Sequence, residues 1–144
     1  SLGSKFTPDG KVLEVLPSPD GFRYLYLCQI GKKKEMRLVL ADGTKRGFLY
    51  QTPASIKDLA WMPDSQQILF AEIHPGFDLG FFTHVSTAKL LDANLGNCLN
   101  LIPPQISAWS PAAATDGVKV AFVAGEGLWY PSFGGKGIWV AALR

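Results

Sequence analysis

The amino-acid sequence predicts an all-β fold of three four-stranded antiparallel meanders, and three observations support this prediction. One segment occurs twice in similar form: KDLAWMPDSQQILFAE begins at Lys57, and ISAWSPAAATDGVKVAFVA begins at Ile106. Glycine (15) and proline (10) lie between short runs rich in Val, Leu, Phe, Tyr and Trp, which is typical of short strands joined by turns. No segment shows a sustained helical period, so we expect almost no helix.

The repeated segment has a spacing of about fifty residues. Trp61 and Trp109 are 48 positions apart, whereas Asp64 and Asp116 are 52 apart because residues 112–115 are extra. Recurrence at such a period indicates repeated supersecondary units.

A weaker third copy, PSPDGFRYLYL, lies nearer the N-terminus. It places Asp20 and Tyr26 44 positions before Asp64 and Phe70, and Phe70 lies 52 positions before Phe122. The chain therefore divides into residues 1–10 (a leader or closure strand), 11–56 (first unit), 57–105 (second unit) and 106–144 (third unit, with its last strand missing).

Strands are expected wherever apolar runs alternate with turn residues. In the first unit they are Val12–Leu16, Phe22–Ile30, Met36–Ala41 and Arg46–Gln51. In the second they are Ile56–Trp61, Gln67–Ile73, Ala88–Ala93 and Cys98–Ile102. In the third they are Gln105–Trp109, Val118–Ala124 and Gly137–Leu143. The GKKK run is predicted to be a short connection, and residues 74–87 a long one with a short strand at 81–85.

The recurring turn and tryptophan residues have structural interpretations. In a Pro-Asp-Gly turn, proline sets φ, aspartate accepts hydrogen bonds and glycine takes positive φ. Asp20, Asp64 and Asp116 are therefore predicted to stabilise turns rather than to catalyse a reaction or bind metal. Trp61 and Trp109 are predicted to pack between units, since a repeated core needs a repeated residue.

The Trp-x-Pro-Asp turn followed by an apolar strand resembles the TolB-like β-propeller repeat. WMPDSQQILFA and WSPAAATDGVKVAFVA carry the resemblance best, and PSPDGFRYLYL lacks the tryptophan. The resemblance implies that each meander is a propeller blade. Because some members of the family are located in the bacterial periplasm or cell envelope, it also implies such a location as an expectation. Three blades do not close a ring, which needs about 4–8. Closure would require further chain of the same protein, or a homodimer with six blades in which the SKFTPDGK segment supplies the missing strand.

The connections between the second and third strands of each unit differ from one another and are expected on one face. Two of them, HPGFDLGFFTHVST and GEGLWYPSFGGK, are long and rich in aromatic residues and glycine, and loops on a rigid scaffold commonly carry binding. The candidate binding residues are Phe77, Asp78, Phe81, Phe82, Trp129, Tyr130 and Phe133. The alternative interpretation is that these aromatic side chains fill the ring channel or cover the next blade.

Composition excludes several function classes. A net charge of +2 argues against nucleic acid as a partner, and no apolar run approaches the roughly 20 residues of a membrane span. The pair His74 and His84, with Asp78 between them, matches no ligand spacing, so we expect no metal and no cofactor. Cys28 and Cys98 are predicted to be free, buried thiols. The basic run 32–34 is predicted to be a solvated hairpin tip.

These observations favour a non-enzymatic scaffold that binds a protein or peptide. The sequence lacks Gly-x-Ser-x-Gly, His-Glu-x-x-His, a phosphate-binding glycine loop and Cys-x-x-Cys, which argues against an enzyme. One alternative is the propeller segment of a larger prolyl-oligopeptidase-like hydrolase with its catalytic domain elsewhere. Another is a small-ligand or glycan binder that uses Trp129, Tyr130 and Asp78.

Overall fold

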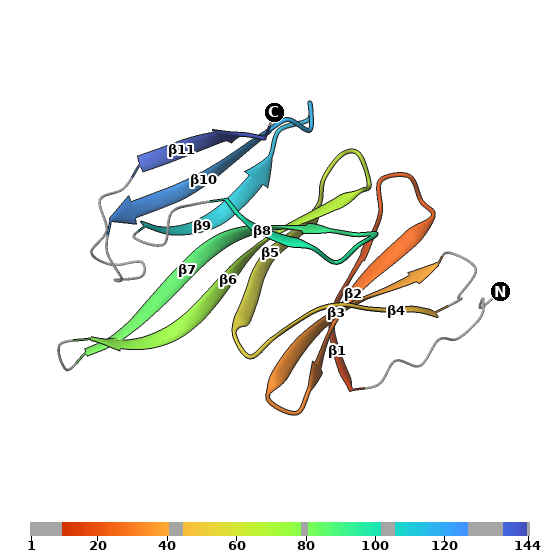
Figure 1. Cartoon of the computed structure of the whole chain (residues 1–144), viewed down its shortest axis with the longest axis horizontal. Coiled ribbons are helices and arrows are strands. Elements are labelled where there is room, and N and C mark those ends of the chain that lie inside the picture. Colours follow the sequence, from red (N-terminus) through yellow and green to blue (C-terminus); the bar gives the residue numbers. More distant parts are fainter. Residues whose placement is uncertain (1–9, 41–44, 79–80, 102–105, 127–136, 144) are drawn as a thin grey trace. The chain divides into compact units, whose positions relative to one another are not determined.

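The computed structural model describes residues 10–40, 45–78, 81–101, 106–126 and 137–143. Within these ranges every regular element is a strand, and the strands form three antiparallel sheets (Figure 1). The prediction of an all-β fold of meanders is therefore confirmed. The chain divides into two compact units, of which Ser1–Pro53 contains the first sheet and Ala54–Arg144 the other two. The predicted boundaries between repeats and the role of residues 1–10 stay predictions.

The first sheet is a four-stranded meander. Its strands, in spatial order, are β1 (Lys11–Pro17), β2 (Arg23–Ile30), β3 (Lys33–Leu40) and β4 (Lys45–Thr52). β2 lies inside the sheet, and Leu25 and Cys28, which occupy opposite faces, are both fully buried. The sequence of this strand is consequently apolar on both faces.

The short connection predicted for the GKKK run is only two residues long. Ile30 pairs directly with Lys33, so the hairpin loop is Gly31 and Lys32, and the second and third lysines of the run belong to β3. Gly31 has a φ of 63°, as the twist of a tight two-residue hairpin requires. The prediction that the whole run forms the hairpin tip was wrong. Lys33 and Lys34 already belong to β3, because the end of a strand accommodates polar side chains.

The second and third sheets continue the pattern. The second contains β5 (Ser55–Trp61), β6 (Gln67–Asp78), β7 (Phe81–Asp92) and β8 (Cys98–Asn100) in spatial order. The third contains β9 (Ile106–Ala113), β10 (Lys119–Glu126) and β11 (Gly137–Ala142), and has three strands among the described residues. In that part of the chain β11 pairs only with β10 and forms an edge of its sheet.

The repeated aspartates stabilise turns, as predicted. A carboxylate oxygen accepts a hydrogen bond from the backbone N–H two residues later, at 3.0 Å for Asp20 and at 2.9 Å for both Asp64 and Asp116. The residue after the aspartate has a positive φ, 72° at Gly117 and 59° at Ser65. The second repeat thus holds a non-glycine residue in the conformation that glycine adopts in the third.

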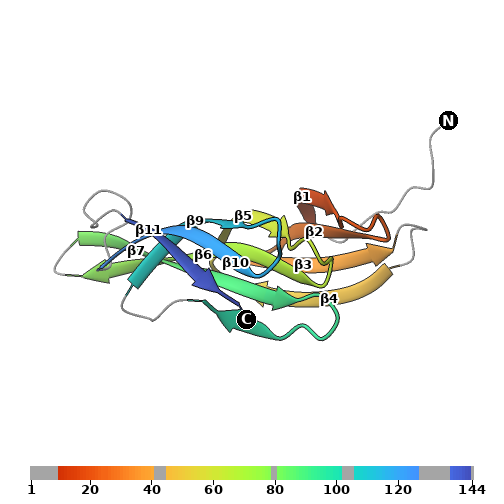
Figure 2. The same cartoon turned by 90° about the horizontal axis from the view of Figure 1, so that it is seen from above.

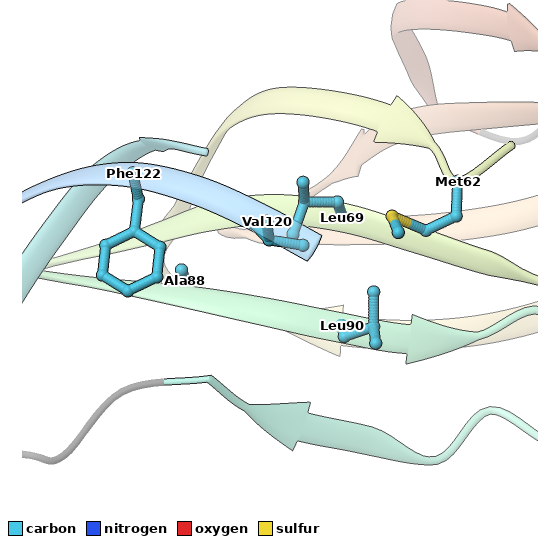
Figure 3. Close-up of a cluster of buried hydrophobic side chains, with 6 residues drawn as sticks. All are labelled: Met62, Leu69, Ala88, Leu90, Val120 and Phe122. Carbon is cyan, nitrogen blue, oxygen red and sulfur yellow. The ribbon is translucent and has the colours of Figure 1, made fainter. Parts of the chain in front are cut away.

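A hydrophobic core lies between the second and third sheets, where the third sheet packs over β6 and β7 (Figure 1 and Figure 2). Figure 3 shows its buried members, which are Met62, Leu69, Ala88, Leu90, Val120 and Phe122. Trp61, beside Met62, is also buried, and its predicted role in packing between units stays a prediction. The side chain of Trp109 lies outside the described part. Burial of a side chain as large as Phe122 contributes about 2–3 kcal/mol to stability.

Both cysteines are free, as predicted, but only Cys28 is buried. Cys98 is exposed because β8 is a three-residue strand at the sheet edge whose residues are all exposed. The prediction of burial was therefore wrong for Cys98.

Candidate functional site

The hairpin of β6 and β7 extends beyond the rest of its sheet. The pairing of β5 with β6 ends at the Ser55–Ile73 pair, and that of β7 with β8 ends at Lys89. β6 and β7 remain paired as far as Asp78 and Phe81 (Figure 1). Residues 74–78 and 81–85 thus form a two-stranded extension, which we call the arm.

The arm corrects the prediction of a long connection over residues 74–87, of which only residues 81–85 were predicted to form a strand. Pro75 and Gly76 indicated a break, because proline cannot donate to a ladder. Pro75, however, lies beyond the last β5 partner of β6, at Ile73. The missing N–H of Pro75 therefore removes no hydrogen bond between β5 and β6. The pairing of β6 with β7 continues past Pro75 without a register shift.

The arm brings together four of the seven predicted binding residues. Phe77 lies directly opposite Phe82, and Asp78 lies opposite Phe81. Phe77 and Asp78 belong to a strand and not to a loop, contrary to the prediction, whereas Phe81 and Phe82 lie where a short strand was predicted. The other three candidates, Trp129, Tyr130 and Phe133, lie outside the described residues, so their role stays a prediction.

A polar cluster around one buried carboxylate, that of Glu72, lies at the base of the arm. The side chain of Glu72 is 3% exposed, and its Oε1 is 3.2 Å from Nζ of Lys89 on the neighbouring strand. Nε2 of His74 contacts the same oxygen. The hydroxyl of Thr87 donates to the backbone oxygen of Glu72 at 3.4 Å. Because a buried carboxylate requires hydrogen-bonded or charged partners, this cluster fixes β6 against β7 where the arm leaves the sheet. Sequence reasoning missed it, and Glu72 in an otherwise apolar strand was the available signal.

The thiol of Cys98 is near this cluster but is not activated. Partial burial of the sulfur raises its pKa, Lys89 opposes that shift and the carboxylate of Glu72 adds to it. Reactive cysteines have a lowered pKa, so the geometry does not indicate a nucleophile. Among the described residues no group of three or more His, Cys, Asp or Glu side chains is arranged to hold a metal ion.

A pocket of about 330 Å³ lies at the other end of β6, near its first residue, Gln67. Its lining includes turn residues of the second and third sheets: Asp64, Gln66, Gln67, Leu90, Asp92, Leu99, Gly117 and Leu143. Both carboxylates already accept backbone hydrogen bonds, Asp64 from Gln66 and Asp92 from the amides of the two residues Asn94 and Leu95. The acids of this pocket thus serve its turns, and we assign no ligand to it.

Comparison with solved structures finds similar arrangements in functionally diverse proteins. A eukaryotic initiation factor matches 99% of this chain at 12% identity and a TM-score of 0.64, over 32% of its own length. The acylaminoacyl peptidase of Pyrococcus horikoshii matches 93% at 13% identity and a TM-score of 0.61, over 25% of its length. A putative TolB from Agrobacterium tumefaciens matches 88% at 20% identity and a TM-score of 0.54, over 41% of its length.

The chain has a TolB-like β-propeller fold. It spans from a quarter to about two fifths of the length of these three structures. Identities of this size show the propeller fold alone. No protein-family model matches the sequence, and no curated protein matches it. The described part of the propeller contains no helix that could cross a membrane.

Proposed function

We propose that this propeller is a non-enzymatic scaffold that binds a protein or peptide through the arm. The observation that carries the proposal is the register of the hairpin, which places Phe77, Asp78, Phe81 and Phe82 together at its end. Aromatic residues are frequent hot spots at protein interfaces because they bury a large area with few rotatable bonds.

The base of the arm favours tight binding. The contact of Glu72 in β6 with Lys89 in β7 holds the two strands together, so a partner would restrict little further backbone motion, and binding would lose less entropy. Within the described residues, neither outer edge of the arm pairs with another strand. An extended peptide could therefore add to an edge by backbone hydrogen bonds.

The test begins with selection of binders from a random peptide library on the immobilised chain. Substitution Phe77→Ser, and separately Phe82→Ser, is expected to weaken the selected peptides by about 30-fold, the effect of losing a hot spot of about 2 kcal/mol. The melting temperature should stay unchanged. Leu95→Ser is the control, since Leu95 is 75% exposed and lies in the β7–β8 turn. Equal affinity of both arm variants and the parent chain would refute the proposal.

A second candidate is the propeller segment of a larger peptidase. The observation that favours it is the match to the acylaminoacyl peptidase, of which the chain spans 25%. This candidate requires a Gly-x-Ser-x-Gly segment elsewhere in the same gene, and sequencing of the full gene tests it. For either candidate, we propose the periplasm or cell envelope as the setting to test first.

A further inference from the structure

The direction of the backbone N–H and C=O groups along β7 follows from two hydrogen bonds outside the arm. The carbonyl oxygen of Ala88 accepts from the amide of Leu101 at 2.9 Å, and the amide of Asp92 donates to the carbonyl oxygen of Asn97 at 2.8 Å. Both groups therefore point to the side of β7 on which β8 lies. Because successive residues of a strand direct their backbone groups to opposite edges, every second residue of β7 points to this side.

In the arm, the residues of β7 that point to this outer edge are Phe82 and His84. The register of β7 with β6 is unbroken from Asp92 to Phe81, so the alternation continues into the arm without a bulge. The pairing of β7 with β8 ends at Lys89, and among the described residues no other strand pairs with this edge (Figure 1). Phe82 and His84 thus each direct an N–H and a C=O group to an edge where the structure describes no partner strand.

The outer edge of β6 is a poorer template for an added strand. The carbonyl oxygen of Gln67 accepts from the amide of Met62 at 2.8 Å, on the β5 side. By the same alternation, Pro75 and Phe77 direct their backbone groups to this side. Proline has no N–H, so residues 74–78 offer one donor there, that of Phe77. Proline on a sheet edge is one of the features by which proteins prevent strand addition.

The sequence that follows β8 is unsuited to cover the edge of β7 in the arm. β8 runs antiparallel to β7, and Asn100 pairs with Lys89. A continued ladder would bring Pro103 and Pro104 alongside the base of the arm. Proline cannot donate to a ladder, and the next strand, β9, belongs to another sheet. This segment therefore does not provide the donors that a strand beside the arm would need.

We propose that the partner of the arm is an extended peptide that pairs with the outer edge of β7 at Phe82 and His84. This inference rests on the proposed function, and it specifies the edge that binds and the groups that are recognised. The peptide is recognised by its backbone N–H and C=O groups, with a period of two residues. Phe77 lies opposite Phe82, so peptide side chains on that face lie beside an aromatic pair. Apolar side chains are therefore expected at alternate positions of the peptide.

Amide hydrogen exchange, measured by NMR, tests this edge at single residues. In the free chain the amides of Phe82 and His84 are expected to exchange rapidly, whereas the amides of Thr83 and Val85, which point to β6, are expected to be protected. The probe is a peptide selected from the random library. At saturation it is expected to slow exchange at Phe82 and His84 by at least about tenfold, and to leave exchange at Phe77 unchanged.

A proline substitution removes one donor of the proposed edge. His84→Pro is compatible with the hairpin, because the paired position in β6 is already a proline, Pro75. The variant is expected to bind the selected peptide about tenfold more weakly, the effect of one lost hydrogen bond. His84→Ala is the matched control, because it removes the side chain but keeps the N–H, and it should bind more tightly than His84→Pro. Circular dichroism checks that both variants are folded.

Methylation of single backbone nitrogens in the selected peptide tests the same hydrogen bonds without any change in the chain. Methyl groups at alternate positions are expected to weaken binding by about tenfold, because those N–H groups donate to β7. Methyl groups at the intervening positions, whose N–H groups point away from the arm, should weaken it less. Equal effects at all positions would contradict recognition by strand pairing.

The exchange data also identify other occupants of the edge. Slow exchange at Phe82 and His84 in the free chain at every concentration would show that the chain covers its own edge. Slow exchange that develops only at high concentration would show that a second copy covers it. Protection of Phe77 in place of Phe82 and His84 would assign the peptide to β6. Each of these three results would overturn the inference.

Failure of the proposed function gives a different result. If no peptide is selected, or if Phe77→Ser and Phe82→Ser bind as the parent chain does, both proposals are refuted. If binding depends on both phenylalanines but the amides of Phe82 and His84 still exchange rapidly in the complex, only the pairing with β7 is refuted.

Discussion

The carboxylate of Glu72 and the ammonium of Lys89 lie 3.2 Å apart across β6 and β7, and Glu72 is nearly inaccessible to water. Such a pair costs desolvation energy, and loss of one partner is more harmful than replacement of both. Lys89→Met is therefore expected to destabilise the chain by about 3 kcal/mol. The double variant Glu72→Leu/Lys89→Met should be destabilised less, since no charge then remains buried. Urea denaturation of the three chains measures both effects, and the opposite order would contradict the assignment.

Phe122 anchors the core between the second and third sheets. Phe122→Ala should lower the free energy of unfolding by about 3–5 kcal/mol, because it leaves a cavity beside Ala88 and Leu90. Leu95→Ala, a change at an exposed position, should have an effect within about 0.5 kcal/mol. Chemical denaturation provides both values. A small effect at Phe122 would mean that this core does not stabilise the fold.

Substitution of Gly117 measures the free-energy cost of the positive-φ turn conformation for a residue with a side chain. Its φ is 72°, and a Cβ at this position would meet no atom within 4 Å, so a side chain there introduces strain without a clash. Gly117→Ala is expected to cost about 1 kcal/mol. Gly117→Asn should cost less, because asparagine tolerates positive φ. Thermal unfolding of the three chains at one pH decides the order, and equal stabilities would contradict the turn geometry.

Asp20 gives the first turn a dependence on pH. The hydroxyl of Ser18, and next the backbone N–H of Phe22, donate to its carboxylate and lower its pKa from 3.8. The lowered pKa means that folding favours the ionised form. The resulting stabilisation is complete above the pKa of the unfolded chain and is lost as pH falls through the folded value.

Asp20→Asn supplies the control for this effect, because the amide oxygen still accepts hydrogen bonds but does not titrate. The melting-temperature difference between the parent chain and this variant should shrink as pH falls below 3.8. A difference that stays constant through acidic pH would show that the carboxylate charge does not stabilise the turn.

The sequence was sufficient to predict the meanders because their turns and strand cores repeat. Asp64 and Asp116 occupy matching positions of the repeat, which indicates the same turn in both units. The structure shows the same hydrogen bond at both residues. Local patterns of this kind require no knowledge of distant contacts. The exposure of Cys98 followed from the edge position of a short strand, which no local pattern reveals.

The arm could not be predicted in the same way. Pro75 and Gly76 locally resemble a break in the strand, and only the point at which β5 stops, at the partner of Ile73, makes proline acceptable in β6. The contact of Glu72 with Lys89 likewise depends on the register of two strands, since the two residues are 17 positions apart in sequence. Tertiary pairing, and not composition, determines both features.

The edge strand β11 has a consequence for handling the protein. Its sequence, GIWVAA, contains no charge and no proline, and in the described part of the chain it bonds to a sheet on one side only. Uncharged six-residue segments of high β-propensity are the typical nuclei of amyloid fibrils. When the free edge of β11 is not covered, concentrated solutions of this chain should therefore form fibrils over time. A seeded thioflavin fluorescence assay would measure the rate of fibril formation.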